Sequence, residues 1–212
     1  MHEYFTFGVL WFTAFFTILN PIGILPVFMT MTNSFTVVER RKTALKAVII
    51  AFAILLGFAF LGEFLFKFFG ISVNSFRVVG GIIFFLVGFD MLQARLTKTK
   101  ISKNEVKEYS DDISITPLAI PMITGPGAIT NAIVFMNDAN TIVLKLVLVG
   151  VIIVTFLLIY IILASSTKII KVLGETGNKV LMRLMGLIVM VIAVEFFFSG
   201  LKPIIQDILS GV

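Results

Sequence analysis

The feature that most constrains this chain is a series of six long apolar runs separated by short polar connections. About 20 helical residues are needed to cross the ~30 Å hydrocarbon core of a bilayer, and only helices of that length satisfy their backbone hydrogen bonds within one segment. Transmembrane strands would instead appear as alternating segments of about ten residues. The sequence therefore predicts an all-α membrane protein with six transmembrane helices. The predicted helices cover residues 4–31, 43–69, 73–93, 113–135, 141–165 and 180–201.

The composition excludes a water-soluble domain. Of the 212 residues, 58% are hydrophobic and 14% are charged, whereas soluble domains are roughly 45–50% apolar and about 25% charged. The net charge of +5 does not indicate a nucleic-acid partner, because the basic residues lie in the connections and form no stripe along a helix. The first run follows Glu3 and has no Lys, Arg or small-residue cleavage site, which predicts a retained span rather than a signal peptide.

Residues that support catalysis are scarce. The chain has no cysteine and one histidine, His2, so we expect no metal, no cofactor and no imidazole-based site. Intramembrane catalysis requires paired acids, an activated serine, or His and Cys ligands, and we therefore expect no enzyme. Three other classes stay open: a secondary transporter, a passive channel or exporter for small polar solutes, and a structural membrane protein. A channel would need a continuous polar lining, which these apolar runs lack.

The connections differ in their content of Lys and Arg. Thirteen of the 17 basic residues lie in the connections after the first, third and fifth runs or at their edges, and four lie on the other side. The positive-inside rule places the thirteen in the cytoplasm. We therefore predict a multi-pass protein of the inner or plasma membrane, with both termini outside and the charged connection at residues 95–112 inside.

The two halves of the chain resemble each other. The motif Asn20-Pro21-Ile22-Gly23 aligns with Gly125-Pro126-Gly127-Ala128 at an offset of 105, and the segments that begin at Arg77 and Arg183 align at an offset of 106. Because each unit has three spans, the second must insert upside down, which is the inverted-repeat architecture of many transporters. We predict a first repeat at residues 1–95, a linker at 96–112 and a second repeat at 113–212, together forming one transport domain.

Both motifs combine proline with glycine inside an apolar run. Proline removes a backbone donor and glycine tolerates unusual backbone angles, so we expect spans one and four to be broken at mid-membrane depth. Half-helix ends that meet there offer free amides to a carboxylate and free carbonyls to an ammonium group. The alternative is a pair of simple kinks. The predicted substrate-binding residues, with equal roles for the two motifs, are Asn20, Pro21, Ile22, Gly23, Thr124, Gly125, Pro126, Gly127, Thr130 and Asn131.

Other small residues and three acids, Glu63, Asp90 and Glu195, also lie within or at the edge of the runs. Small residues along one stripe let helices pack closely. Acids within spans are rare and suggest an ion pathway, so Asp90 and Glu195 are candidates for coupling, with snorkelling to the interface as the alternative. The small residues assigned to packing are Ala53 and Gly57, Gly81 and Gly88, and Gly186, Ala193 and Gly200.

Two stretches resemble the signature sequences of the MarC family of membrane proteins: residues 20–28 (NPIGILPVF) and residues 117–129 (PLAIPMITGPGAI). The resemblance extends over essentially the whole chain. It implies a secondary transporter of small neutral amino acids, chiefly glycine and alanine as in the SnatA branch, within the LysE-type transporter superfamily. It also implies coupling to an ion gradient, of H+ or Na+, and a site built around residues 20–23 and 124–127. The lipid bilayer is a further expected partner, and the sequence leaves a homo-oligomer open.

Overall fold

The computed structural model describes residues 2–93 and 113–210. Every element within these ranges is helical, which confirms the predicted all-α class. The predicted linker at residues 96–112 lies outside the described ranges. The elements, in chain order, are α1 (His2–Leu19), α2 (Pro21–Met31), α3 (Val37–Phe69), α4 (Val73–Leu92), η1 (Ser114–Ile123), α6 (Pro126–Asp138), α7 (Ile142–Ala164) and α8 (Ser166–Ser210).

These elements form five or six stretches able to cross a membrane, in agreement with the apolar runs. One further span arises if η1 and α6, which meet at a bend of 58°, are counted together. α1 and α2 together make up the first stretch. The other five stretches are Tyr4–Met31, Val37–Phe69, Val73–Leu92, Ile142–Ala164 and Thr176–Ser210.

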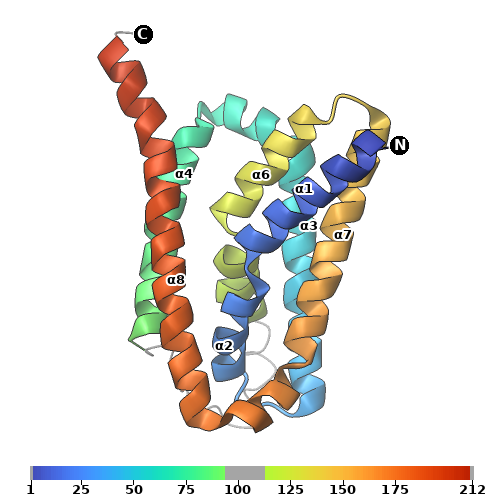
Figure 1. The fold of residues 1–212 in the computed structure, drawn as a ribbon, viewed down its shortest axis with the longest axis vertical. Helices are drawn as coiled ribbons and strands as arrows, with labels where there is room; N and C mark the ends of the chain where they lie inside the picture. Colours follow the sequence, from blue (N-terminus) through green and yellow to red (C-terminus); the bar gives the residue numbers. More distant parts are fainter. Residues whose placement is uncertain (1, 94–112, 211–212) are drawn as a thin grey trace.

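Two helices begin earlier than predicted. α3 starts at Val37 rather than residue 43, because Thr36 and Glu39 form a capping box in which each side chain accepts the other's amide, at 3.3 and 2.8 Å. α8 starts at Ser166 rather than residue 180, because residues 166–173 form a helical segment that crosses one end of the molecule (Figure 1). The chain then turns at Gly174, whose φ of 65° favours glycine.

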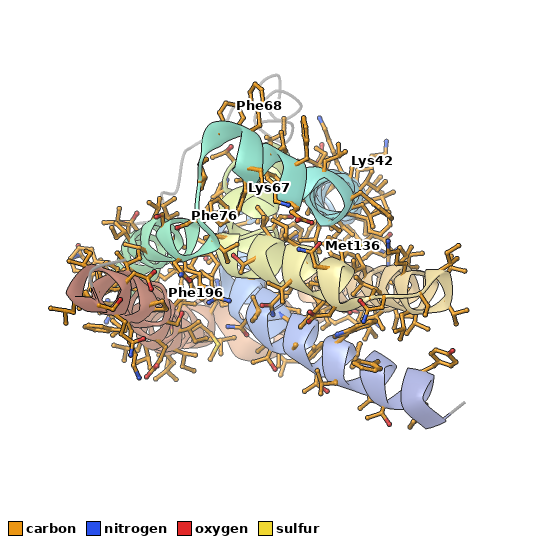
Figure 2. All side chains as sticks on the ribbon, turned by 90° about the horizontal axis from the view of Figure 1, so that it is seen from above. Lys42, Lys67, Phe68, Phe76, Met136 and Phe196 are labelled. Atoms are coloured by element: carbon orange, nitrogen blue, oxygen red, sulfur yellow. The ribbon has the colours of Figure 1, made fainter. Side chains whose placement is uncertain are left out.

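The helices form two flanks with short elements between them. α4 and α8 lie side by side along one flank, and α1, α3 and α7 form the other (Figure 1). The view from above shows the same separation of α4 and α8 from α1, α6 and α7 (Figure 2). α2, η1 and α6 lie between the flanks. α1 begins and α8 ends at the same end of the molecule, and we call the opposite end, where α2 connects to α3, the α2–α3 end.

Small residues form the contact between α4 and α8, as predicted. A Cβ atom built at Gly81 would lie 2.8 Å from the Ala193 carbonyl oxygen, and one at Gly88 would lie 2.9 Å from that of Gly186. The two helices are therefore antiparallel and touch backbone to backbone. The packing prediction for Ala53 and Gly57 is wrong, because both residues are exposed and no atom lies within 4 Å of a Cβ at Gly57.

Candidate functional site

Asn20 separates α1 from α2. It has φ 39° and ψ 63°, and it is the one non-glycine residue with positive φ in the described ranges. Asparagine tolerates this left-handed conformation better than most residues, and the following Pro21 has no N–H to continue α1. The Asn20 Oδ1 atom accepts the Gly23 amide at 3.1 Å and so caps α2. At the first helix interruption, the Asn20 side chain thus gives a hydrogen-bond partner to an amide at the start of α2.

Gly23 makes this cap sterically feasible. A Cβ atom at residue 23 would lie 2.5 Å from the Asn20 Nδ2 atom. The Asn20 carbonyl oxygen also accepts the amides of Gly23 and Ile24, at 2.9 and 3.2 Å. The glycine therefore leaves room for the asparagine side chain. The Oδ1 atom keeps one lone pair for another donor, since an amide oxygen accepts two hydrogen bonds.

The second interruption, at Thr124 and Gly125, is built differently. The residues before the two η1 prolines, Thr116 and Ile120, have extended backbone angles, as expected for positions that precede proline. Thr124 is fully buried, and its hydroxyl donates to the Ala51 carbonyl of α3 at 3.0 Å. Gly125 then occupies the N-cap position of α6, and no described side chain caps that helix. The α6 N-terminus is therefore without the acceptor that Asn20 gives to α2.

One partly open cavity lies beside both interruptions. This cavity has a volume of about 40 Å³, above the ~10–15 Å³ of such space that one water molecule needs. Gly125 packs directly against Phe84 of the lining, and a Cβ at Gly127 would lie 3.0 Å from the lining residue Ile18. Asn20 supplies the one hydrophilic side chain of the lining. The lining residues are Ile18, Leu19, Asn20, Gly23, Ile24, Phe84, Val87, Met91, Met122, Val189 and Ile192.

The remaining predicted site residues fall into three groups. Pro21 and Pro126 are buried, and Pro126 packs against Gly80 of α4. Ile22 points outward, with 53% of its surface exposed. Asn131 is half-buried, whereas Thr130 is fully buried and its hydroxyl has no hydrogen-bond partner among the described residues. A buried hydroxyl without a partner is unusual, since most such groups are satisfied by protein or water.

The two candidate coupling acids do not line the cavity. Asp90 and Glu195 are both exposed on the surfaces of α4 and α8. Within the described residues, no three His, Asp or Glu side chains come together in a way that could hold a metal ion. The structure thus places Asn20 and Gly23 in the cavity lining and the glycines of the second motif directly behind it, against Phe84 and Ile18. It places the two acids elsewhere.

The sequence interpretation missed Arg40, which it counted only as a basic residue of a connection. Arg40 is 6% exposed. Its Nε and Nη2 atoms donate to the Thr32 hydroxyl and carbonyl at 3.1 and 2.7 Å, and Nη1 donates to the Thr167 hydroxyl at 3.1 Å. One signal was available: Arg40 lies four residues before Ala44, on the same buried stripe of small residues that continues through Ala47 and Ala51.

Comparison with known proteins gives one consistent result. Residues 5–205 match the MarC family of integral membrane proteins. The chain is 40% identical over 196 residues to a UPF0056 membrane protein of Methanocaldococcus jannaschii, covering 92% of this chain and 95% of the relative. It is 34% identical over 201 residues to the UPF0056 membrane protein YhcE of Escherichia coli, covering 94% of each. No solved structure matches.

Proposed function

Because this chain belongs to the MarC family of integral membrane proteins, we propose that it is a secondary transporter with its solute site between the two helix interruptions. The observation that carries the proposal is the partly open cavity whose lining residues contact both interruptions. Broken helices are otherwise unfavourable within a bilayer, because freed backbone groups need partners there. Transporters use such interruptions to bind a solute near the membrane midplane.

The packing of the helices supports an inverted repeat. If α1 and α2 correspond to η1 and α6, and α3 and α4 correspond to α7 and α8, the most extensive contacts have counterparts in the other half. α1 packs on α7 as η1 packs on α3, and α2 packs on α8 as α6 packs on α4. Two further contacts, α3 with α7 and α4 with α8, each join two helices that correspond to one another, so each is its own counterpart. This arrangement suits alternating access, in which one part of the protein moves against another around a fixed site.

The proposed solute is a small neutral amino acid, with glycine and alanine preferred. The α6 N-terminus carries partial positive charge and lacks a side-chain cap, so it suits a carboxylate. The unpartnered Thr130 hydroxyl lies in the second turn of the same helix. The free lone pair of Asn20 Oδ1 suits an ammonium group. The small cavity and its apolar wall leave little room for a larger side chain.

We propose further that the protein resides in the inner or plasma membrane with its termini outside. The Lys and Arg asymmetry supports this orientation, and both ends of the chain lie at the same end of the molecule (Figure 1). Transport is coupled to H+ or Na+ in this proposal, and the protein performs no catalysis. The exposed Asp90 and Glu195 are less suited to coupling than their positions in the sequence suggested.

Uptake of labelled glycine into proteoliposomes tests the function. With an imposed H+ or Na+ gradient, the purified protein should accumulate glycine above equilibrium, and alanine should compete better than leucine. Protein-free liposomes and dissipated gradients are the controls. Equilibration without accumulation would favour the channel alternative. Protein that stays folded but neither transports glycine nor is stabilised by it would contradict the proposal, because a ligand that binds the folded state raises its stability.

A further inference from the structure

Arg40 joins three elements at the α2–α3 end of the molecule. It lies in the first turns of α3, it contacts Thr32 at the C-terminus of α2, and it contacts Thr167 in the transverse segment at residues 166–173 of α8. The guanidinium therefore meets the C-terminal carbonyl of α2, where a helix carries partial negative charge. No ion pair to Arg40 is found among the described residues. Its buried charge is stabilised by this helix end and two hydroxyl groups.

A second polar contact holds α2 to the long part of α8, beyond Gly174. The Asn178 Nδ2 atom donates to the Thr30 hydroxyl at 3.1 Å. The same hydroxyl lies 3.7 Å from the Met182 sulfur. α2 is thus attached to α8 on both sides of the turn at Gly174. We call the contacts of Arg40 with Thr32 and Thr167, and of Thr30 with Asn178, the α2 latch.

Two polar atoms at or next to the α2 latch are left unsatisfied in the closed arrangement. The Ser166 hydroxyl and the Asn178 Oδ1 atom are both buried without a hydrogen-bond partner among the described residues. Opening this end to water would hydrate both atoms, and closure forfeits that hydration. The hydrogen bonds of Arg40 favour closure, and the two unsatisfied atoms oppose it. Because these two effects oppose each other, releasing the contact costs less free energy than the loss of the Arg40 hydrogen bonds alone.

α2 connects the latch to the cavity. Asn20, Gly23 and Ile24 at its N-terminal end line the cavity, and Thr32 at its C-terminal end contacts Arg40. The residues between, 25–29, are all buried. A path from the cavity to the α2–α3 end must therefore pass along α2, and displacement of α2 from α8 would open it.

From these contacts we propose that the α2 latch, with Arg40 at its centre, closes the cavity toward the α2–α3 end, and that its release opens the cavity to that side. The inference rests on the proposed transport function, because only a transporter needs this closure. Arg40 is in this account a positioning residue, which acts through α2 and does not touch the solute.

Cysteine labelling tests the latch without measuring transport. The chain has no cysteine, so Ile24→Cys places a single thiol in the cavity wall, and Ser34→Cys in the exposed α2–α3 connection reports which membrane face is reached. In the Ile24→Cys background, Arg40→Gln should raise the labelling rate by a membrane-impermeant maleimide from that face at least about tenfold. Glutamine cannot replace all three hydrogen bonds of Arg40, and the loss of even one hydrogen bond to a charged group corresponds to about that factor. Arg41→Gln, which removes an exposed neighbouring cation, should leave the rate unchanged.

A second variant and a second reporter cover the other outcomes. If Arg40→Gln does not fold, Thr167→Val removes one latch contact and should still accelerate labelling of Ile24→Cys. Leu148→Cys, fully buried in α7 away from the cavity, should stay unlabelled in every variant. Unchanged labelling of Ile24→Cys, or equal acceleration by Arg41→Gln or at Leu148→Cys, would overturn the latch. Accelerated labelling in a protein that transports no glycine would keep the latch and reject the proposed function.

Discussion

The two helix interruptions occupy corresponding places in the two halves, yet their hydrogen bonding differs. At the first, the Asn20 side chain caps α2. At the second, Gly125 cannot cap α6, and the Thr130 hydroxyl one turn further along has no partner. The repeat predicted equal roles for the two motifs. The structure shows a side-chain cap at the start of α2 and none at the start of α6, a difference that the proposed binding of a zwitterion would use.

The largest effect should come from glycine substitutions that compare the interruptions directly. A Cβ at Gly125 would collide with Phe84 and lie 2.8 Å from the Pro121 carbonyl oxygen, which belongs to the backbone and cannot move away easily. The three atoms nearest to a Cβ at Gly23 would all belong to the Asn20 side chain. Gly125→Ala should abolish glycine uptake and lower the free energy of unfolding by about 1–3 kcal/mol. Gly23→Ala should reduce uptake less and lower the free energy of unfolding less.

Uptake and thermal unfolding of both variants measure this difference. Gly150→Ala is the matched control, since no atom lies within 4 Å of a Cβ there, and alanine in a helix interior should stabilise it by roughly 0.5–1 kcal/mol. A Gly125→Ala protein that transports normally would refute the close packing of the second interruption against Phe84.

The next effect separates the backbone role of Asn20 from its role toward the solute. Asn20→Gly keeps the left-handed conformation and should cost only a few tenths of a kcal/mol in stability. Asn20→Ala adds the cost of that conformation, roughly 1–2 kcal/mol. Both variants lose the amide, so both should bind glycine more weakly by about 1–3 kcal/mol. Glycine-induced thermal stabilisation measures binding, and wild-type stabilisation of Asn20→Gly would exclude Asn20 from the site.

Thr130→Val should change stability and binding in opposite directions. Valine has nearly the same shape and removes the unsatisfied hydroxyl, so the unliganded protein should gain up to about 1–3 kcal/mol of stability. If the hydroxyl binds the solute carboxylate, stabilisation by glycine should fall at the same time. Thermal unfolding with and without glycine gives both quantities. A variant that gains stability and keeps full glycine stabilisation would place Thr130 outside the site.

The smallest effects are expected from Asp90→Asn and Glu195→Gln. Both side chains are exposed and neither lines the cavity. Each variant should therefore retain glycine binding and gradient-driven uptake near the wild-type level. If either variant exchanged glycine but failed to accumulate it, that acid would carry the coupling despite its exposed position.

Local signals in the sequence predicted the helices and where two of them begin. Apolar length determined the spans, and Pro21 and Pro126 each begin a helix as their missing N–H requires. The faces of the helices were harder to predict. Gly57 and Gly81 look alike in the sequence, but only Gly81 contacts another helix, because the choice depends on which neighbours the fold provides. Arg40 escaped notice for the same reason: its partners Thr32 and Thr167 become neighbours only in the folded chain.

The glycine contact between α4 and α8 has a mechanical consequence. The two helices cannot slide along each other easily, because their backbones are in contact at several glycines. A shift of one residue would place a side chain at a contact where only the hydrogen of glycine fits. We expect α4 and α8 to move together as one rigid body. Each of its two members is preceded by a glycine with positive φ and open space around it, Gly70 before α4 and Gly174 before the long part of α8. These two glycines are the expected hinges, so a conformational change should tilt α4 and α8 together rather than slide one helix past the other.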